Sequence, residues 1–325
     1  MTHITEPLLR ATALGTQVAL APVRVLGTLA EGRRVEIDRD IRRSLGVSAE
    51  PKPLVMDPGR AFLHPDAVAR RVHADLPSMM IAGLSTLLLQ TLHPLTMAGV
   101  AEHSDYAADP VGRLRRTSAF VAYTTYGTNE QARDAIEAVK RTHVKVRGIA
   151  PDGRSYSASD PELVTWVHVA EVSTFLHSAQ RFGPRRFTRE QCDAYYAETS
   201  AVAYELGATW VPRSVDEVKA YFRRIRPDLY AGPQALSARA FLLRGVGTKP
   251  EDRAAYAVLA GAAVSLLPGW AKAELGLPAI PLADRLVVVP LGRALTFGLR
   301  WALTLPADPT ACAERRADTE SDGKT

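Results

Sequence analysis

Apolar residues recur every three or four positions along most of the chain, which is the spacing of helices with one buried face. The alternation of apolar and polar residues that marks a strand is nearly absent. The sequence therefore predicts an all-α fold with a single large helical domain. Pro and Gly residues separate the expected helices, which cover 75–99 with a break at His93-Pro94, then 111–127, 128–148, 161–182, 189–206, 214–224 and 233–243.

The two ends of the chain lack this helical pattern. Residues 1–65 contain Pro51, Pro53 and Pro58 and are expected to form an irregular lead. Residues 307–325 are polar and charged, which predicts a flexible tail. The helical domain is expected to cover residues 66–306.

Two apolar stretches near the C-terminus raise the question of a membrane. Residues 254–270 are almost wholly apolar, but Pro268 and Gly269 end the stretch short of the roughly 20 residues that a spanning helix needs. A buried core helix is the preferred interpretation. Residues 286–305 contain Pro290, Arg293 and Arg300, which is typical of an amphipathic helix on a surface or on the core. A peripheral membrane contact is therefore possible.

Charge and cysteine content exclude several classes of protein. The net charge is +5 and the arginines are scattered among acidic residues, so no nucleic-acid partner is expected. Cys192 and Cys312 stand alone, without the pairs of a disulfide framework, a zinc site or covalently attached haem. The N-terminus lacks the pattern of a secretory signal. These features predict a reducing, cytoplasmic location.

One histidine lies on an apolar helix face. In the third expected helix, steps of four and three residues place five side chains on one side: Ala132, Ile136, Val139, His143 and Val146. The imidazole is therefore expected to point toward the core. A lone histidine in such a place is more often a hydrogen-bonded core residue than a metal ligand, and the spacing alone leaves both interpretations open.

Two arginines and a threonine share a face of the preceding helix. Arg113, Arg116 and Thr117 lie at helical spacing with the less polar residues that follow them, namely Phe120, Val121 and Thr124. Two guanidinium groups beside apolar residues need an anion or a solvated pocket. The alternative is an exposed basic helix end that pairs with Asp or Glu.

Four motifs in order carry a resemblance to a known family. They read LLLQTLHPLTMAGVAEHSDY (87–106), DPVGRLRRT (109–117), HVKVRG (143–148) and DPELVTWVH (160–168). Over residues 76–270 the chain resembles the haem b oxygenases that include the latex-clearing protein (rubber oxygenase) and MpaB. The resemblance implies a globin-like helical core around non-covalent haem b.

The resemblance also implies roles for particular residues. His143 would bind the haem iron through Nε2, and Arg147 completes the His-x-x-x-Arg pattern that accompanies the ligand. Arg113 and Thr117 would line the distal side of the haem. His168 corresponds to a histidine that is frequent in the family, in a structural or supporting role at the haem.

The chain departs from the rubber oxygenase at two positions. Arg116 stands where that enzyme has a lysine that can coordinate iron, and a guanidinium is always protonated and cannot do so. Glu102 is a candidate for the catalytic base, but it lies closer in sequence to Arg113 than the family pattern implies.

Other catalytic motifs are weaker or absent. His103-Ser104-Asp105 has the His-x-Asp spacing of a mononuclear iron site, but such sites usually lie on strands. His103 is a candidate for the pocket wall, and His93 is expected to stabilise the helix break by a hydrogen bond. The sequence contains no di-iron Glu-x-x-His pair, zincin motif, nucleophile elbow or Walker loop.

The sequence thus predicts a haem b-dependent oxygenase that uses O2 to oxidise an apolar or partly apolar small molecule. The reaction could be alkene cleavage, hydroxylation or desaturation, in a pocket walled by Leu88, Leu92, Met97 and Phe120. Two alternatives remain open. One is a haem-binding sensor or carrier without turnover, and the other is a helical interaction protein without haem.

Overall fold

The computed structural model describes residues 54–104, 108–244 and 250–303. Contacts divide the chain into Ala49–Phe297 and a second unit of Met1–Ser48 with Gly298–Thr325, and the first unit is described below by itself. The elements are η1 (Pro58–Arg60), α2 (Val68–His73), α3 (Leu76–Gln90), α4 (Pro94–His103), α5 (Pro110–Tyr126), α6 (Asn129–His143), β1 (Arg147–Ile149), β2 (Ser155–Ser157), α7 (Pro161–Phe182), α8 (Arg189–Leu206), α9 (Val215–Ile225), η2 (Arg226–Asp228), α10 (Pro233–Arg244), α11 (Pro250–Leu266), α12 (Gly269–Glu274), α13 (Pro281–Ala283), the π-helical segment η3 (Asp284–Val288) and α14 (Val289–Ala302). The predicted all-α class is confirmed.

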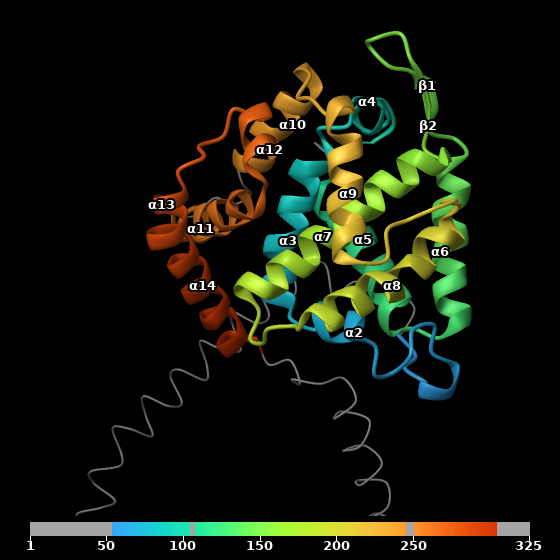
Figure 1. Cartoon of the computed structure of the whole chain (residues 1–325), viewed down its shortest axis with the longest axis horizontal. Helices are drawn as coiled ribbons and strands as arrows, with labels where there is room; N and C mark the ends of the chain where they lie inside the picture. The colour runs from blue at the N-terminus through green and yellow to red at the C-terminus, as the bar shows by residue number, and fades with distance from the viewer. Residues whose placement is uncertain (1–53, 105–107, 245–249, 304–325) are drawn as a thin grey trace, which may run out of the picture. The chain divides into compact units, whose positions relative to one another are not determined.

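Helix α7 is the central element, and it packs against α3 along most of its length (Figure 1). Trp166 of α7 and Leu88 of α3 are both fully buried in the main core cluster. Each large apolar side chain buried in this way contributes about 1.5–3 kcal/mol to folding. The hydroxyls of Thr86 and Thr174 bond to each other across the two helices, so these two buried groups satisfy each other.

Helix starts are fixed by local chemistry. Asp75, Asp109 and Asp160 each cap a helix with a carboxylate that accepts a backbone N–H, and a proline follows in the first turn. The predicted break between two apolar helices is also present, because α3 ends at Gln90 and α4 begins at Pro94. These boundaries are therefore encoded by residues that are neighbours in sequence.

A reciprocal cap fixes the start of α8. The side chain of Thr188 accepts the N–H of Gln191 at 3.3 Å, and Oε1 of Gln191 accepts the N–H of Thr188 at 2.9 Å. We expect Thr188→Ala to lower the free energy of unfolding by about 1 kcal/mol, since one helix N–H loses its partner. Urea unfolding measures this loss. Thr142→Ala, which removes an exposed hydroxyl inside α6, is the control and should change it by less than about 0.5 kcal/mol; equal losses would contradict the capping role.

The third expected helix is shorter than predicted. It was expected to run to residue 148, but α6 ends at His143 and the chain turns into a hairpin of β1 and β2. Val144 and Val146 fit a strand as well as a helix face, because β-branched residues favour extended backbone. Gly153 has a φ of 87° in the loop between the strands, a value that suits glycine. His143 and Val146 are therefore not on one helix.

The apolar stretch near the C-terminus forms a core helix, as predicted. Ala262, Ala263 and Leu266 of α11 are buried in a cluster with residues of α3. The helix ends before Pro268. No helix among the described residues is long and apolar enough to cross a membrane.

The predicted domain boundaries are only partly within the described residues. The flexible tail expected at 307–325 lies outside them, as does the irregular lead except for residues 54–65. Those residues contain a single short turn, η1, which Asp57 caps. The bounds 66–306 of the helical domain stay a prediction.

Candidate functional site

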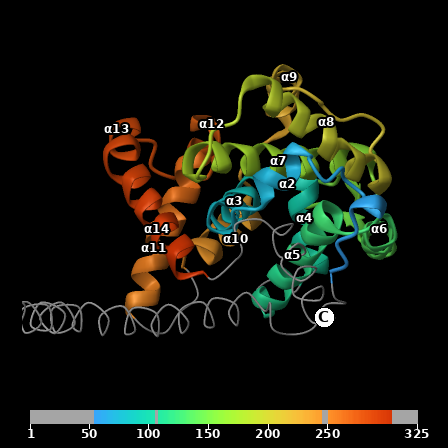
Figure 2. The ribbon, with the colours of Figure 1, turned by 90° about the horizontal axis from the view of Figure 1, so that it is seen from below.

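Several of the predicted site residues lie at or beside the ends of three helices. Glu102 is near the end of α4, Arg113 is in the first turn of α5, and His143 is the last residue of α6. Ser104, just past α4, accepts a hydrogen bond from Arg113, and Glu102 accepts one from Tyr156 in the hairpin that follows α6. Figure 2 shows α4, α5 and α6 on the same side of the unit. The end of α4 therefore contacts both α5 and the hairpin after His143.

His143 is the last residue of α6 and is half-buried. Its Nδ1 is buried and has no hydrogen-bond partner. Burial lowers the pKa of the imidazole, so the neutral ring predominates at pH 7. A neutral imidazole carries a lone pair on one nitrogen and is the form that binds metals. His143 thus has the chemistry of a ligand and no hydrogen bond that fixes its tautomer.

The arginines at the start of α5 are held in different ways. Arg113 is half-buried and donates to the hydroxyl of Ser104, just past the end of α4. Arg116 is exposed and forms an ion pair with Asp109 at 3.3 Å, as the alternative interpretation of these residues expects. Thr117 is exposed. The helix therefore presents its polar residues toward solvent at this end, with Arg113 nearest to α4.

Glu102 is engaged by the hairpin rather than by the arginines. Its Oε2 accepts the hydroxyl proton of Tyr156, and His103 Nε2 lies 3.1 Å from the same hydroxyl oxygen. Burial, with the bond to Glu102 next in importance, raises the pKa of Tyr156 to about 12. Gly148 is required here, because a Cβ would lie 2.7 Å from the Tyr156 hydroxyl. The exposed side chain of Arg147, in β1, lies outside this group of hydrogen bonds.

His168 occupies the interior of α7. It is 8% exposed, and its Nε2 is buried without a hydrogen-bond partner. Burial lowers its pKa to about 4, so this ring is also neutral. Glu171 follows one turn later, and burial raises the pKa of its carboxyl to about 7. These two residues are a second pair of poorly solvated titratable groups, near the middle of the central helix.

A half-buried histidine with complete hydrogen bonding was not predicted from the sequence. His73 of α2 lies 2.8 Å from Thr125 Oγ1 through Nδ1 and 3.0 Å from the Tyr195 hydroxyl through Nε2. Burial lowers its pKa to about 4. The partners come from α5 and α8, so no local motif indicates them. Glu171 offered a signal, since it is an acid amid the apolar residues of a long helix.

Two expectations for other residues need correction. His93 was expected to hydrogen-bond at the helix break, but its Nδ1 has no partner and its ring packs against Trp166 at 5.9 Å between centroids. Leu88 and Leu92, expected in the pocket wall, are fully buried in the main core cluster. Among the described residues, no three His, Cys, Asp or Glu side chains form a metal site, and Asp105 lies outside those residues.

Comparisons with known proteins identify the family. The sequence model described as "ER-bound oxygenase mpaB/B'/Rubber oxygenase, catalytic domain" matches residues 70–301. A solved structure of latex clearing protein LCP in the closed state is similar, with a TM-score of 0.54 and 17% sequence identity over 89% of this chain and 85% of that one. No curated protein matches at a significant level. Since the sequence model spans well over half of the chain, the protein belongs to the MpaB and rubber oxygenase catalytic-domain family.

Proposed function

We propose that this chain is a haem b-dependent oxygenase that uses O2 to oxidise an apolar or partly apolar organic molecule. The observation that carries the proposal is the neutral, half-buried imidazole of His143, whose Nδ1 lacks a partner. It stands in the motif where the family resemblance implies an iron ligand. Membership of an oxygenase family supports oxidation with O2 as the reaction class. The substrate and the cofactor are part of the proposal.

The residues present fit a haem group in two respects. The uncharged ring of His143 would supply the nitrogen ligand, and the arginines at the start of α5 would supply cations for the two propionate carboxylates. When bound, haem would supply the O2 binding and redox chemistry that oxidation of an organic substrate requires.

Arg113 and Thr117 would line the part of the site where O2 is reduced, as the family resemblance implies. The guanidinium of Arg113 is held by Ser104 and is permanently charged, so it can stabilise negative charge that develops beside it as oxygen is reduced. Arg116 would hold a propionate or keep its pair with Asp109. Because it cannot lose its proton, it would serve only as a cation.

Glu102 is proposed as a proton acceptor, with Tyr156 as its positioning residue. The Tyr156 hydroxyl bonds to Oε2 of Glu102, which leaves Oε1 to accept a proton from the substrate. His168 would support the site from α7 as a second neutral imidazole. The apolar substrate would meet the half-buried side chain of Phe120 on α5. A cytoplasmic location stays a prediction.

Haem titration of the purified chain tests the proposal. We expect a Soret band that saturates at one haem per chain, followed by O2 consumption when an apolar co-substrate and a reductant are supplied. Saturable haem binding without O2 consumption across a panel of alkenes would favour the sensor or carrier alternative. A chain that binds no haem would favour the interaction protein and would contradict the proposal.

Arg113 provides a test that separates chemistry from cofactor binding. We expect Arg113→Ala to retain the haem and to lower the rate of O2 consumption roughly tenfold, because one charge-assisted hydrogen bond is lost. The control is Arg115→Ala, since Arg115 is exposed one residue from the proposed face. A similar loss of rate in both variants would argue against a specific role for Arg113.

A further inference from the structure

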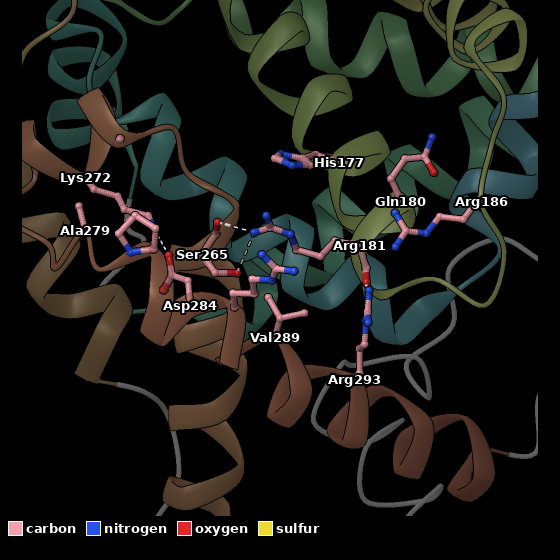
Figure 3. A pocket seen from close by; sticks show the side chains of 13 residues that line it. His177, Gln180, Arg181, Arg186, Ser265, Lys272, Ala279, Asp284, Val289 and Arg293 are labelled. Carbon is pink, nitrogen blue, oxygen red and sulfur yellow. Dashed lines mark hydrogen bonds and ion pairs between the residues drawn. The ribbon is translucent and has the colours of Figure 1, made fainter. Parts of the chain in front are cut away.

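A second site lies far along the central helix from His168. A cavity of about 730 Å³ opens at the C-terminal end of α7, between this end and α11, α12, η3 and α14 (Figure 3). None of the residues predicted from the sequence to act in catalysis or cofactor binding lines it. The volume is in the range of small-molecule sites in proteins. The cavity therefore needs an explanation separate from the oxygenase site.

The lining of the cavity is strongly basic. It contains five cations, which are Arg181, Arg186, Lys272, Arg285 and Arg293, and one carboxylate, Asp284. Asp284 accepts from Lys272 Nζ at 2.5 Å, and Lys272 is only 5% exposed. The single carboxylate of the lining is therefore already paired with the buried lysine.

The four arginines have no carboxylate of their own within the described part of the chain. Arg181 donates to the backbone oxygen of Ser265 at 2.8 Å, and Arg293 Nε donates to the backbone oxygen of Arg181 at 3.1 Å (Figure 3). Both acceptors are neutral. Arg186 and Arg285 are exposed at the cavity and have no hydrogen bond or ion pair to a described residue.

The positive charges of these arginines, which line one cavity, repel one another. Burial lowers the pKa of Arg181, and the charges of Arg293 and Arg186 lower it further, while Asp284 acts in the opposite direction. A concave site that concentrates one sign of charge attracts an ion of the other sign. The arrangement is costly to the protein alone and is relieved by a bound anion.

We propose that this cavity binds a phosphate group, with Arg181, Arg186, Arg285 and Arg293 as its donors. Four guanidinium groups offer more N–H donors than a single carboxylate can accept, whereas a phosphate or diphosphate accepts them through several oxygens. The group can come from a soluble phosphate or from the headgroup of an anionic phospholipid. The second source is included because Leu282 and Leu286, on either side of Arg285, are 67% and 62% exposed.

Calorimetric titration of the full chain with pyrophosphate tests the binding of phosphate. We expect saturable binding at low ionic strength that weakens about tenfold in Arg186→Gln and in Arg285→Gln, since each removes a charge-assisted contact. The matched control is Arg185→Gln, because Arg185 is the exposed neighbour of Arg186 and does not line the cavity. It should bind as the unchanged protein does.

Co-sedimentation with vesicles distinguishes the two sources of the phosphate group. Binding to phosphatidylcholine vesicles that contain phosphatidic acid, lost in Arg186→Gln and absent with pure phosphatidylcholine, would assign the lipid headgroup. Pyrophosphate binding without vesicle binding would assign a soluble phosphate. The proposal is overturned if neither probe binds, or if Arg185→Gln weakens binding as much as the two cavity variants do.

Discussion

Replacing His143 by alanine is expected to weaken haem binding on the order of a hundredfold or more, with oxygenase activity lost in parallel. In the proposed site, His143 would supply the protein's nitrogen ligand to the iron. The fold should survive, because His143 is the last residue of α6 and is half-buried, and alanine favours helix. Haem titration at the Soret band measures the affinity, and circular dichroism measures the helix content.

Two further histidines make this test specific. His64→Ala changes an exposed histidine and should leave haem binding unchanged. His168→Ala removes another buried imidazole with an unpartnered nitrogen, and the haem should remain bound, less tightly. If His143→Ala kept its haem and His168→Ala lost it, the ligand would be His168, and the motif at 143–148 would have another role.

The second large effect expected is a strong pH dependence of the free energy of unfolding. Burial lowers the pKa of His73, His93 and His168 from 6.5 to about 4. Between these values the unfolded chain binds protons that the folded chain does not, so stability falls as pH falls from about 6.5 to about 4. Each group contributes up to about 3 kcal/mol, at 1.36 kcal/mol per pKa unit.

Glu171 acts in the opposite direction. Burial raises its pKa from 4.5 to about 7, so the unfolded chain releases this proton first and stability falls as pH rises between these values. Glu171→Gln removes the cost of an ionised, poorly solvated carboxylate. We expect this variant to gain up to about 3 kcal/mol at pH 8 and less than about 1 kcal/mol at pH 5.

Urea unfolding of the haem-free chain at both pH values measures this difference, because bound haem would add its own stabilisation. Glu130→Gln is the control, since Glu130 is exposed in a surface pair with Arg60, and it should change stability by less than about 0.5 kcal/mol. An equal gain at pH 5 and pH 8 for Glu171→Gln would mean that the carboxyl does not titrate between them.

Part of the candidate site could be predicted from the sequence because its chemistry is carried by neighbouring residues. The motifs at 109–117 and 143–148 named Arg113 and His143, and apolar spacing placed the imidazole on the inner face of α6. The partners could not be predicted in this way. Ser104, which accepts from Arg113, and Tyr156, which donates to Glu102, lie on other elements.

The hairpin after His143 shows where local pattern is ambiguous. Val146 fits the spacing of the helix face, yet it follows the end of α6 and packs in a cluster with Tyr156. A helix through Gly148 would forgo the pairing of β1 with β2. The close approach of Gly148 to the Tyr156 hydroxyl depends on residues from three elements. Tertiary contacts therefore decided between two backbones that the local sequence allows.

The sequence by itself determined the all-α class, the helix starts at Asp75, Asp109 and Asp160, and the motifs that define the family. Capping, proline placement and apolar spacing act over one or two helical turns, so they can be recognised in the sequence without a structure. Only the tertiary structure decided which titratable groups lose their water, as Glu171 does, and which arginines share a cavity, as Arg186 and Arg285 do. Desolvation and charge repulsion depend on segments about a hundred residues apart, and packing alone brings them together.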